Sequence, residues 1–173
     1  MIMGLVAVLL LVIVQRLFEL QIAQRHRTAL LARGAYEVGQ GHYPFFVLLH
    51  SLFFVSLVGE VTLWHRTSPA WWPFAAVMLA VAQGLRLWCI RSLGVFWNTR
   101  IIVLPGAALV KKGPYRYLRH PNYLVVIIEL LVLPLLFGAY GTSLVFSLAN
   151  LVLLLWVRIP MEEAALAYKK TAQ

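Results

Sequence analysis

The chain has 173 residues, a length that corresponds to a single domain. Apolar residues make up 62% of it and charged residues only 12%. A water-soluble domain carries about 25% charged residues, so the composition indicates a membrane protein. Fifteen Lys and Arg against six Asp and Glu give a formal net charge of +9, but they lie between apolar runs and not on a soluble basic face, which argues against a nucleic-acid partner. The single cysteine, Cys89, excludes an intrachain disulfide and a multi-cysteine metal site.

Five stretches of the chain are apolar enough to cross a bilayer, whose hydrocarbon core of about 30 Å requires a helix of roughly 20 residues. We expect these spans near residues 2–22, 43–64, 72–93, 123–137 and 142–159. Only the turn GAYG separates the last two, which predicts a C-terminal helical hairpin. The fourth span is short and contains Pro134, so we expect it to be tilted or broken where other protein covers its backbone. The predicted fold class is an all-α integral membrane protein with about five transmembrane helices.

Basic residues alternate between the loops and predict the orientation. The first loop contains Arg25, Arg27 and Arg33, and the third loop and the C-terminal tail are also basic, whereas the second loop contains Arg66 and the GAYG turn has no basic residue. Because cytoplasmic loops are enriched in Lys and Arg, we expect the first loop, the third loop and the C-terminus in the cytoplasm and the N-terminus outside. Aromatic residues near span ends are typical of membrane–water interfaces, and we assign to them Tyr43, Trp64, Trp71, Trp72, Trp88 and Trp97.

Five charged residues fall inside the predicted spans: Arg16, Glu19, Glu60, Arg86 and Glu129. Each is costly near the bilayer centre unless it is paired. Arg16 and Glu19 can pair on one helical face, and Arg86 can pair with Glu129 across helices. Two interpretations remain open, namely ion pairs that hold the helices together and a polar cavity within the bundle. The alternative function is a small transporter or channel with these charges as its path, although the chain shows no internal repeat of the kind that transporters contain.

The third loop ends in a polar and aromatic segment, GPYRYLRHPNY, at residues 113–123. Tyr115 and Tyr123 offer aromatic faces suited to a flat base or to a cation. His120 is a switchable hydrogen-bond donor or acceptor, and Asn122 can cap the helix that Pro121 begins, whose free N–H groups favour anionic ligand groups. The segment suits a ligand with an aromatic base, a sugar and a charged tail. The alternative is an interfacial loop whose basic residues face lipid phosphates.

A second charged segment, RIPMEEAAL, follows the fifth span at residues 158–166. Arg158 and Glu162 lie one helical turn apart and can project on the same side, and Pro160 between them predicts a break in the helix at the membrane surface. An arginine there can bind an anionic acceptor, and a nearby carboxylate can hold a ribose or amino group. The alternative is a snorkelling arginine beside a solvated acidic turn. The five histidines show no metal-binding spacing, so no metal site is predicted.

The two segments, with an apolar hairpin between them, resemble the signature of the isoprenylcysteine carboxyl methyltransferase family. That signature is a G-x-Y-x-x-x-R-H-P-x-Y segment, a helical hairpin and an R-x-x-x-E-E-x-x-L segment, and the resemblance covers residues 104–166. The segments GHYPF (41–45), RLWCIRSLG (86–94) and WNT (97–99) are similar to a small bacterial branch of the family, whose members are likened to O-methyltransferases for alkylpyrones.

The resemblance implies a membrane-embedded O-methyltransferase with S-adenosylmethionine as its cofactor. By position in the motifs, the cofactor-binding residues would be Leu109, Val110, Tyr115, His120, Pro121, Asn122, Tyr123 and Glu162. Arg158 would bind the acceptor oxygen, and Arg158 and Glu162 are the catalytic residues that the resemblance implies. Residues 1–173 would form one methyltransferase domain, with three spans in residues 1–93 and the catalytic part, including a cytoplasmic cofactor-binding loop, in residues 94–173.

The implied acceptor is a lipophilic small molecule or membrane lipid with an isoprenylcysteine-like carboxylate or an alkylpyrone-like enol. Val125 stands where the family pattern R-H-P-x-Y-x-G has its last glycine, and the F-G-x-x-Y-x-x-Y tail of longer members does not follow the second motif, which favours a small lipid over a prenylated protein. We expect the protein in a bacterial cytoplasmic membrane with its active site on the cytoplasmic side, and no oligomeric state is predicted.

Overall fold

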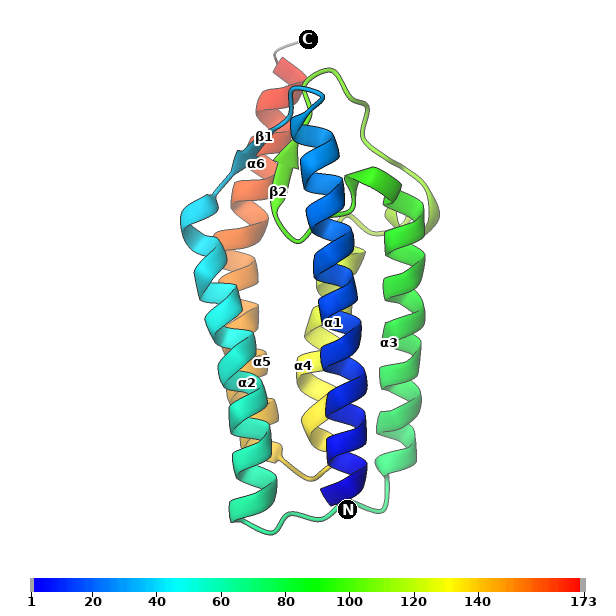
Figure 1. The fold of residues 1–173 in the computed structure, drawn as a ribbon, viewed down its shortest axis with the longest axis vertical. Helices are drawn as coiled ribbons and strands as arrows, with labels where there is room; N and C mark the ends of the chain where they lie inside the picture. Colours follow the sequence, from blue (N-terminus) through cyan, green and yellow to red (C-terminus); the bar gives the residue numbers. More distant parts are fainter. Residues whose placement is uncertain (1, 172–173) are drawn as a thin grey trace.

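The computed structural model describes residues 2–171, and helices dominate this part of the chain (Figure 1). The α-helices are α1 (Ile2–Leu31), α2 (Tyr43–Leu63), α3 (Trp72–Leu93), α4 (Pro121–Leu135), α5 (Tyr140–Leu153) and α6 (Ile159–Thr171). A π-helical turn, η4 (Leu154–Arg158), joins α5 to α6. Short 3₁₀ helices lie at η1 (Gln40–His42), η2 (Gly94–Phe96) and η3 (Gly113–Arg116), and two short strands at β1 (Tyr36–Val38) and β2 (Ile101–Val103).

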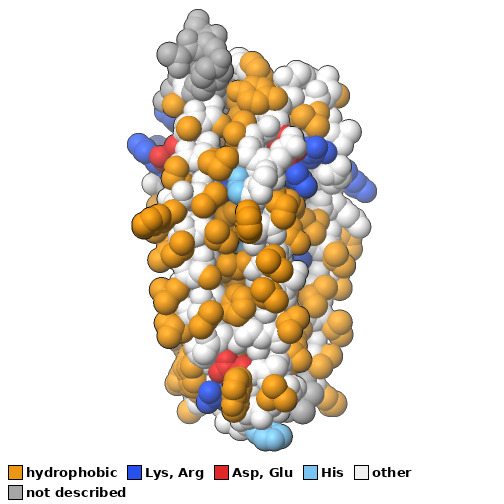
Figure 2. All heavy atoms as spheres, turned by 90° about the vertical axis from the view of Figure 1, so that its left-hand side faces the viewer, with side chains coloured by type: hydrophobic (Ala, Val, Ile, Leu, Met, Phe, Trp, Pro, Cys, Tyr) orange, Lys and Arg blue, Asp and Glu red, His pale blue; other side chains and the backbone are white. Residues whose placement is uncertain are grey.

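The surface of the bundle is that of a membrane protein. Four helical segments are long and apolar enough to span a bilayer: Met3–Leu31, Gln40–Leu63, Trp72–Phe96 and Tyr140–Ala167. Large apolar side chains such as Leu11 and Trp156 point outward, with 69% and 80% of their surface exposed. Figure 2 shows apolar side chains over the middle of one face, with charged side chains toward its two ends. The predicted all-α integral membrane fold is confirmed.

The helices run side by side along the long axis, and the connections sort to two ends (Figure 1). The N-terminus, the α2–α3 connection and the α4–α5 turn lie at one end. The β1–β2 ribbon, the long loop after α3 and helix α6 lie at the other, which we call the loop end. Successive connections therefore lie at opposite ends of the bundle, as the sequence predicted. The side of the membrane that each end faces remains a prediction.

The predicted hairpin between α4 and α5 is present and is closed by glycine. Gly138 has φ +70°, and the N–H groups of Ala139 and Gly138 donate to the carbonyls of Pro134 (3.0 Å) and Leu135 (3.3 Å). This pattern is a Schellman motif, which requires a left-handed residue at its centre. Pro134 lies in the last turn of α4, so the short fourth helix ends at Leu135 without a break in its middle.

Glu60 lies at the end of the bundle opposite the loop end, where it caps α5. Its carboxylate accepts hydrogen bonds from the N–H of Gly141 (3.1 Å) and from the N–H (2.6 Å) and hydroxyl (2.8 Å) of Thr142, and it lies 3.4 Å from Arg66. A carboxylate at a helix N-terminus is stabilised by the free N–H groups and the helix dipole. Glu60 therefore has a structural role of its own and does not share a hydrogen bond or ion pair with Arg16, Glu19, Arg86 or Glu129 in the described part of the chain.

At the loop end the structure differs from the sequence expectations. Helix α1 continues to Leu31, nine residues past the predicted span end at 22, and Gly34 (φ +86°) follows it. Strands β1 and β2 pair antiparallel with Glu37 opposite Ile102, a pairing that was not predicted because strands of three residues show no detectable alternation. Hydrogen bonds from Arg100 (2.6 Å) and Arg27 (2.9 Å) outweigh the effect of burial and hold the pKa of Glu37 below its usual value.

The predicted break at Pro160 is wrong, because the helix continues from α5 through η4 into α6. Proline lacks an N–H donor, and in an α-helix its ring meets the carbonyl four residues earlier. In η4 the N–H of Ile159 donates to the carbonyl of Leu154, five residues earlier, so the turn before the proline is wider than an α-helical turn. The wider turn accommodates the proline ring, and Arg158 lies within that turn.

The apolar core fills the half of the bundle away from the loop end. Its buried side chains come mainly from α1, α2 and α4, and include Leu5, Phe53, Leu57, Leu130 and Leu133. Toward the loop end, polar residues and cavities replace this packing. The division leaves the loop-end half of the bundle available for a ligand.

Candidate active site

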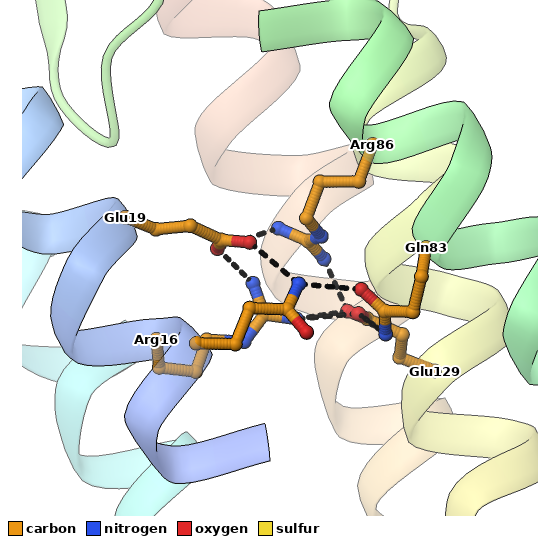
Figure 3. A network of polar contacts seen from close by, with 6 residues as sticks. Arg16, Glu19, Gln83, Arg86 and Glu129 are labelled. Atoms are coloured by element: carbon orange, nitrogen blue, oxygen red, sulfur yellow. Dashed lines mark hydrogen bonds and ion pairs between the residues drawn. The ribbon is translucent and has the colours of Figure 1, made fainter. Parts of the chain in front are cut away.

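A network of charged side chains lies inside the bundle (Figure 3). Arg16 contacts both Glu19 and Glu129, and Arg86 contacts Glu129 and lies 3.3 Å from Glu19. The amide of Gln83 donates to Glu129 at 2.6 Å. The two predicted pairs are thus confirmed as parts of a single network that joins α1, α3 and α4. Two arginines and two glutamates cancel in charge, so the network is neutral as a whole.

The first of two adjoining cavities, the loop cavity, has a volume of about 110 Å³ and opens beside the third loop. It is lined by six of the side chains predicted from the motifs: Tyr115, His120, Asn122, Tyr123, Arg158 and Glu162. They come from η3, the start of α4, η4 and α6, so the fold brings together the two motifs on either side of the hairpin. Because Pro121 starts α4 at the cavity, the helix N-terminus there favours an anionic group.

Tyr123 is the centre of the contacts in the loop cavity. Its hydroxyl donates to the carboxylate of Glu162 and accepts a hydrogen bond from Nε of Arg158 at 3.0 Å. The ring of His120 stacks on that of Tyr123, with centroids 5.3 Å apart and planes 15° from parallel, and its Nε2 lies 3.4 Å from Glu163. A single phenol thus fixes the positions of the cation and the carboxylate.

Arg158 is buried, with 6% of its surface exposed, and its own contacts are with neutral groups. Besides Tyr123, its guanidinium donates to the carbonyl of Thr99 at 3.0 Å and lies 3.3 Å from Nε2 of His42. No ion pair found within the described part of the chain includes Arg158. A buried cation without a counter-charge in direct contact is unfavourable, so this arginine is suited to bind an anion.

The second cavity, the membrane cavity, has a volume of about 320 Å³ and lies between α1, α2, α4 and α5. Apolar side chains form much of its wall, among them Phe46, Phe54 and Val126. Leu20 of α1 and Val47 of α2 also line it and are 44% and 49% exposed on the outer surface. The cavity therefore reaches the lipid-facing surface between α1 and α2.

The two cavities meet at shared lining residues: Trp97, Asn98, Asn122, Tyr123 and Arg158. A polar ligand in the loop cavity and an apolar ligand in the membrane cavity would thus both reach the guanidinium of Arg158. Trp97, which the sequence placed at a membrane interface, is instead buried at this junction with 1% exposure, because the chain after α3 folds back into the bundle.

Four predicted residues lie apart from the cavity walls or act differently there. Leu109 and Val110 do not line either cavity, and Leu109 is 42% exposed. Pro121 is buried behind the wall as the first residue of α4. Asn122 does not cap this helix, because it is the second helical residue and His120 occupies the N-cap position. The buried Oδ1 of Asn122 has no partner among the described residues.

Tyr115 is neutral in this environment. Burial, together with the nearby Cys89 thiol and Glu162 carboxylate, raises the pKa of Tyr115 well above its usual value. A neutral phenol offers a hydrogen-bond donor and an aromatic face and does not compete with an anionic ligand.

Sequence reasoning did not single out several residues that border the site. His42, Thr99 and Asn98 contact Arg158 or line the cavities. All three belong to the segments GHYPF and WNT, whose resemblance to a family branch was noted without a role. That resemblance was the sequence feature from which these three residues could have been found. Asn150, which lines the membrane cavity from α5, has no such segment around it.

The fold and this junction define an integral membrane protein with a buried cationic site between a polar and an apolar cavity. A family model described as "Isoprenylcysteine carboxyl methyltransferase (ICMT) family" matches residues 74–168, and the chain belongs to that family. The chain is 46% identical to "Uncharacterized protein YpbQ" of Bacillus subtilis, over 90% of this chain and 92% of the relative. It is 30% identical to an uncharacterized protein of Haemophilus influenzae, over 88% of this chain and 89% of the relative. No solved structure matches the chain.

Proposed function

We propose that the protein is an S-adenosylmethionine-dependent O-methyltransferase for a lipophilic acceptor, with its loop end in the cytoplasm of a bacterium. The observation that carries the proposal is the position of Arg158, a buried cation without an ion-pair partner among the described residues, where the two cavities meet. Membership in the methyltransferase family supports the same reaction class.

The side chains that line the loop cavity match the functional groups of the proposed cofactor. The stacked rings of His120 and Tyr123 and the phenol of Tyr115 suit an aromatic base or a sulfonium cation. The carboxylate of Glu162 and the unpartnered Oδ1 of Asn122 can accept hydrogen bonds from amino and ribose hydroxyl groups. We assign cofactor binding to these five residues and to Pro121, and we keep Leu109 and Val110 as predicted contacts from the loop.

When bound, S-adenosylmethionine supplies an electrophilic methyl group. Arg158 would hold the acceptor anion at the junction, and Tyr123 would keep Arg158 in position through its hydroxyl. The apolar wall of the membrane cavity would take the acceptor's hydrocarbon part from the bilayer and exclude water. A carboxylate or acidic enol is already an anion near neutral pH, so orientation can supply the catalysis without a general base. Arg158 and Glu162 are the residues we propose as catalytic.

The alternative of a transporter or channel loses its structural support. Its proposed path required Arg16, Glu19, Glu60, Arg86 and Glu129 to act together. Four of them neutralise one another in one network, and Glu60 caps α5 elsewhere in the bundle.

Binding of the cofactor product tests the proposal directly. S-adenosylhomocysteine should raise the Tm of the purified protein in detergent, whereas NADPH, the cofactor that a membrane lipid reductase would require, should not. His120→Ala and Tyr123→Ala should weaken this stabilisation, because they remove the stacked pair in the loop cavity. Membranes incubated with methyl-labelled S-adenosylmethionine and lipid extracts should then yield a labelled lipid. Absence of any stabilisation by S-adenosylhomocysteine would contradict the proposal.

A further inference from the structure

Asn150 is a polar residue in an apolar setting that the proposed reaction leaves unexplained. It lies in α5, is 0% exposed and lines the membrane cavity. Neither Nδ2 nor Oδ1 of its amide has a hydrogen-bond partner among the described residues. Because leaving both ends of a buried amide unpaired is unfavourable, nearly all such groups in proteins have a partner. An unpaired amide on a cavity wall is therefore suited to a ligand.

Asn150 lies on the α5 wall of the membrane cavity, on the N-terminal side of Arg158. It precedes Arg158 by eight residues on one continuous helix, which corresponds to roughly 12 Å along the axis. Arg16 and Arg86 line the same cavity farther from the junction than Tyr123 does. Both contact Glu129, which follows Tyr123 by six residues on α4. The backbone positions of Arg158 and Asn150 are thus about two helical turns apart.

A neutral group suits the position beside Asn150. The other charges that line the cavity, Arg16, Glu19 and Arg86, already cancel within the network that they form with Glu129. His50, which also lines the cavity, has its Nδ1 2.7 Å from the carbonyl of Phe46. An amide such as that of Asn150 can donate to a carbonyl oxygen or accept from a hydroxyl group without any charge.

We propose that Asn150, whose Cα lies about 12 Å along the helix axis from that of Arg158, forms a second polar subsite, which binds a neutral carbonyl or hydroxyl group on the tail of the acceptor. The proposal rests on the proposed function for the role of Arg158. It narrows the substrate class to lipophilic acids or enols with a second oxygen group partway along the tail. A plain hydrocarbon tail would leave the amide of Asn150 unpaired.

Positional isomers of one fatty acid separate this subsite from general lipophilicity. The probes are 9-oxododecanoate, 4-oxododecanoate and dodecanoate, titrated into the detergent-solubilised protein by calorimetry. We expect the 9-oxo isomer to bind about fivefold more tightly than the 4-oxo isomer, as one added hydrogen bond predicts. Asn150→Leu should abolish this preference while it retains binding of dodecanoate.

Ser147→Ala is the matched control. Ser147 lies one turn before Asn150 on α5, and its buried hydroxyl also has no partner among the described residues, but it does not line either cavity. This variant should keep the fivefold preference. Equal affinities for the two isomers in the unaltered protein, as a water molecule held by Asn150 would give, or a preference that survives Asn150→Leu, would overturn the subsite.

The outcome is independent of methyl transfer. A positional preference that depends on Asn150 would support the subsite even if S-adenosylhomocysteine did not bind, in which case only the proposed reaction fails. Binding of S-adenosylhomocysteine without any positional preference would refute the subsite alone. Asn150→Leu should also raise the Tm, since it replaces an unpaired amide by an apolar side chain of similar size, and this change serves as the check that the variant folds.

Discussion

The guanidinium of Arg158 is held by groups that cannot neutralise it, namely a phenol, a carbonyl and an imidazole. We expect Arg158→Ala to lower methyl transfer about 100-fold, the typical cost of a misplaced reactant, and to leave stabilisation by S-adenosylhomocysteine intact. Arg158→Lys should recover only part of the activity, because lysine keeps the charge without the planar fork of donors. Rates with labelled cofactor and lipid extract measure both.

Arg33→Ala is the control for that comparison, because Arg33 is an exposed arginine at the same end of the bundle and does not line either cavity. It should have full activity. Full activity of Arg158→Ala would remove Arg158 from the site.

At the scale of single residues, the sequence was informative where a motif surrounded the residue. Tyr123, Arg158 and Glu162 meet as the two motifs suggested, although the hairpin separates them along the chain. Asn150 and Trp97 could not be placed in the same way. One asparagine in an apolar run has no local pattern, and the position of Trp97 depends on how the chain folds back after α3.

The hairpin between α4 and α5 provides a test at the scale of an element. A Cβ at Gly138 would lie 2.5 Å from the carbonyl oxygen of Thr67, in addition to the left-handed φ of +70°. Gly34 has a similar φ of +86° but nothing within 4 Å of the same position. Both alanine variants should lose about 1–2 kcal/mol from the left-handed backbone, and Gly138→Ala should lose more because of the clash.

Thermal unfolding in detergent compares the two glycine variants directly. A Tm for Gly138→Ala equal to or above that of Gly34→Ala would show that the α2–α3 connection does not pack against the hairpin turn.

The elements predicted best were those with strong periodicity or composition. The helices and the hairpin follow from long apolar runs and a glycine turn. The β1–β2 ribbon and the end of α1 at Leu31 were not predicted, because these segments contain polar residues and hydropathy does not distinguish their secondary structure. The break expected at Pro160 failed for a different reason, since the rule for proline assumes an α-helical turn before it.

The basic residues predict the orientation of the whole molecule in the membrane. The loop end contains the first and third loops, which are rich in Lys and Arg. We expect a fluorescent protein fused to the C-terminus to fluoresce in bacterial cells, and alkaline phosphatase fused at the same place to be inactive. Phosphatase fused within the α2–α3 connection should be active. The opposite pattern would place the loop cavity outside the cell and contradict the proposed function.

The wide turn η4 helps to set the direction in which the Glu162 side chain points. An α-helix advances about 100° per residue, so a wide turn offsets the azimuth of everything that follows it. Removing one residue between Leu154 and Arg158 would convert the wide turn to an α-helical turn and leave Glu162 facing Tyr123, whereas removing Met161, after the turn, would rotate Glu162 by that angle away from Tyr123. The direction of the Glu162 carboxylate thus depends on the number of residues before it as well as on their identity.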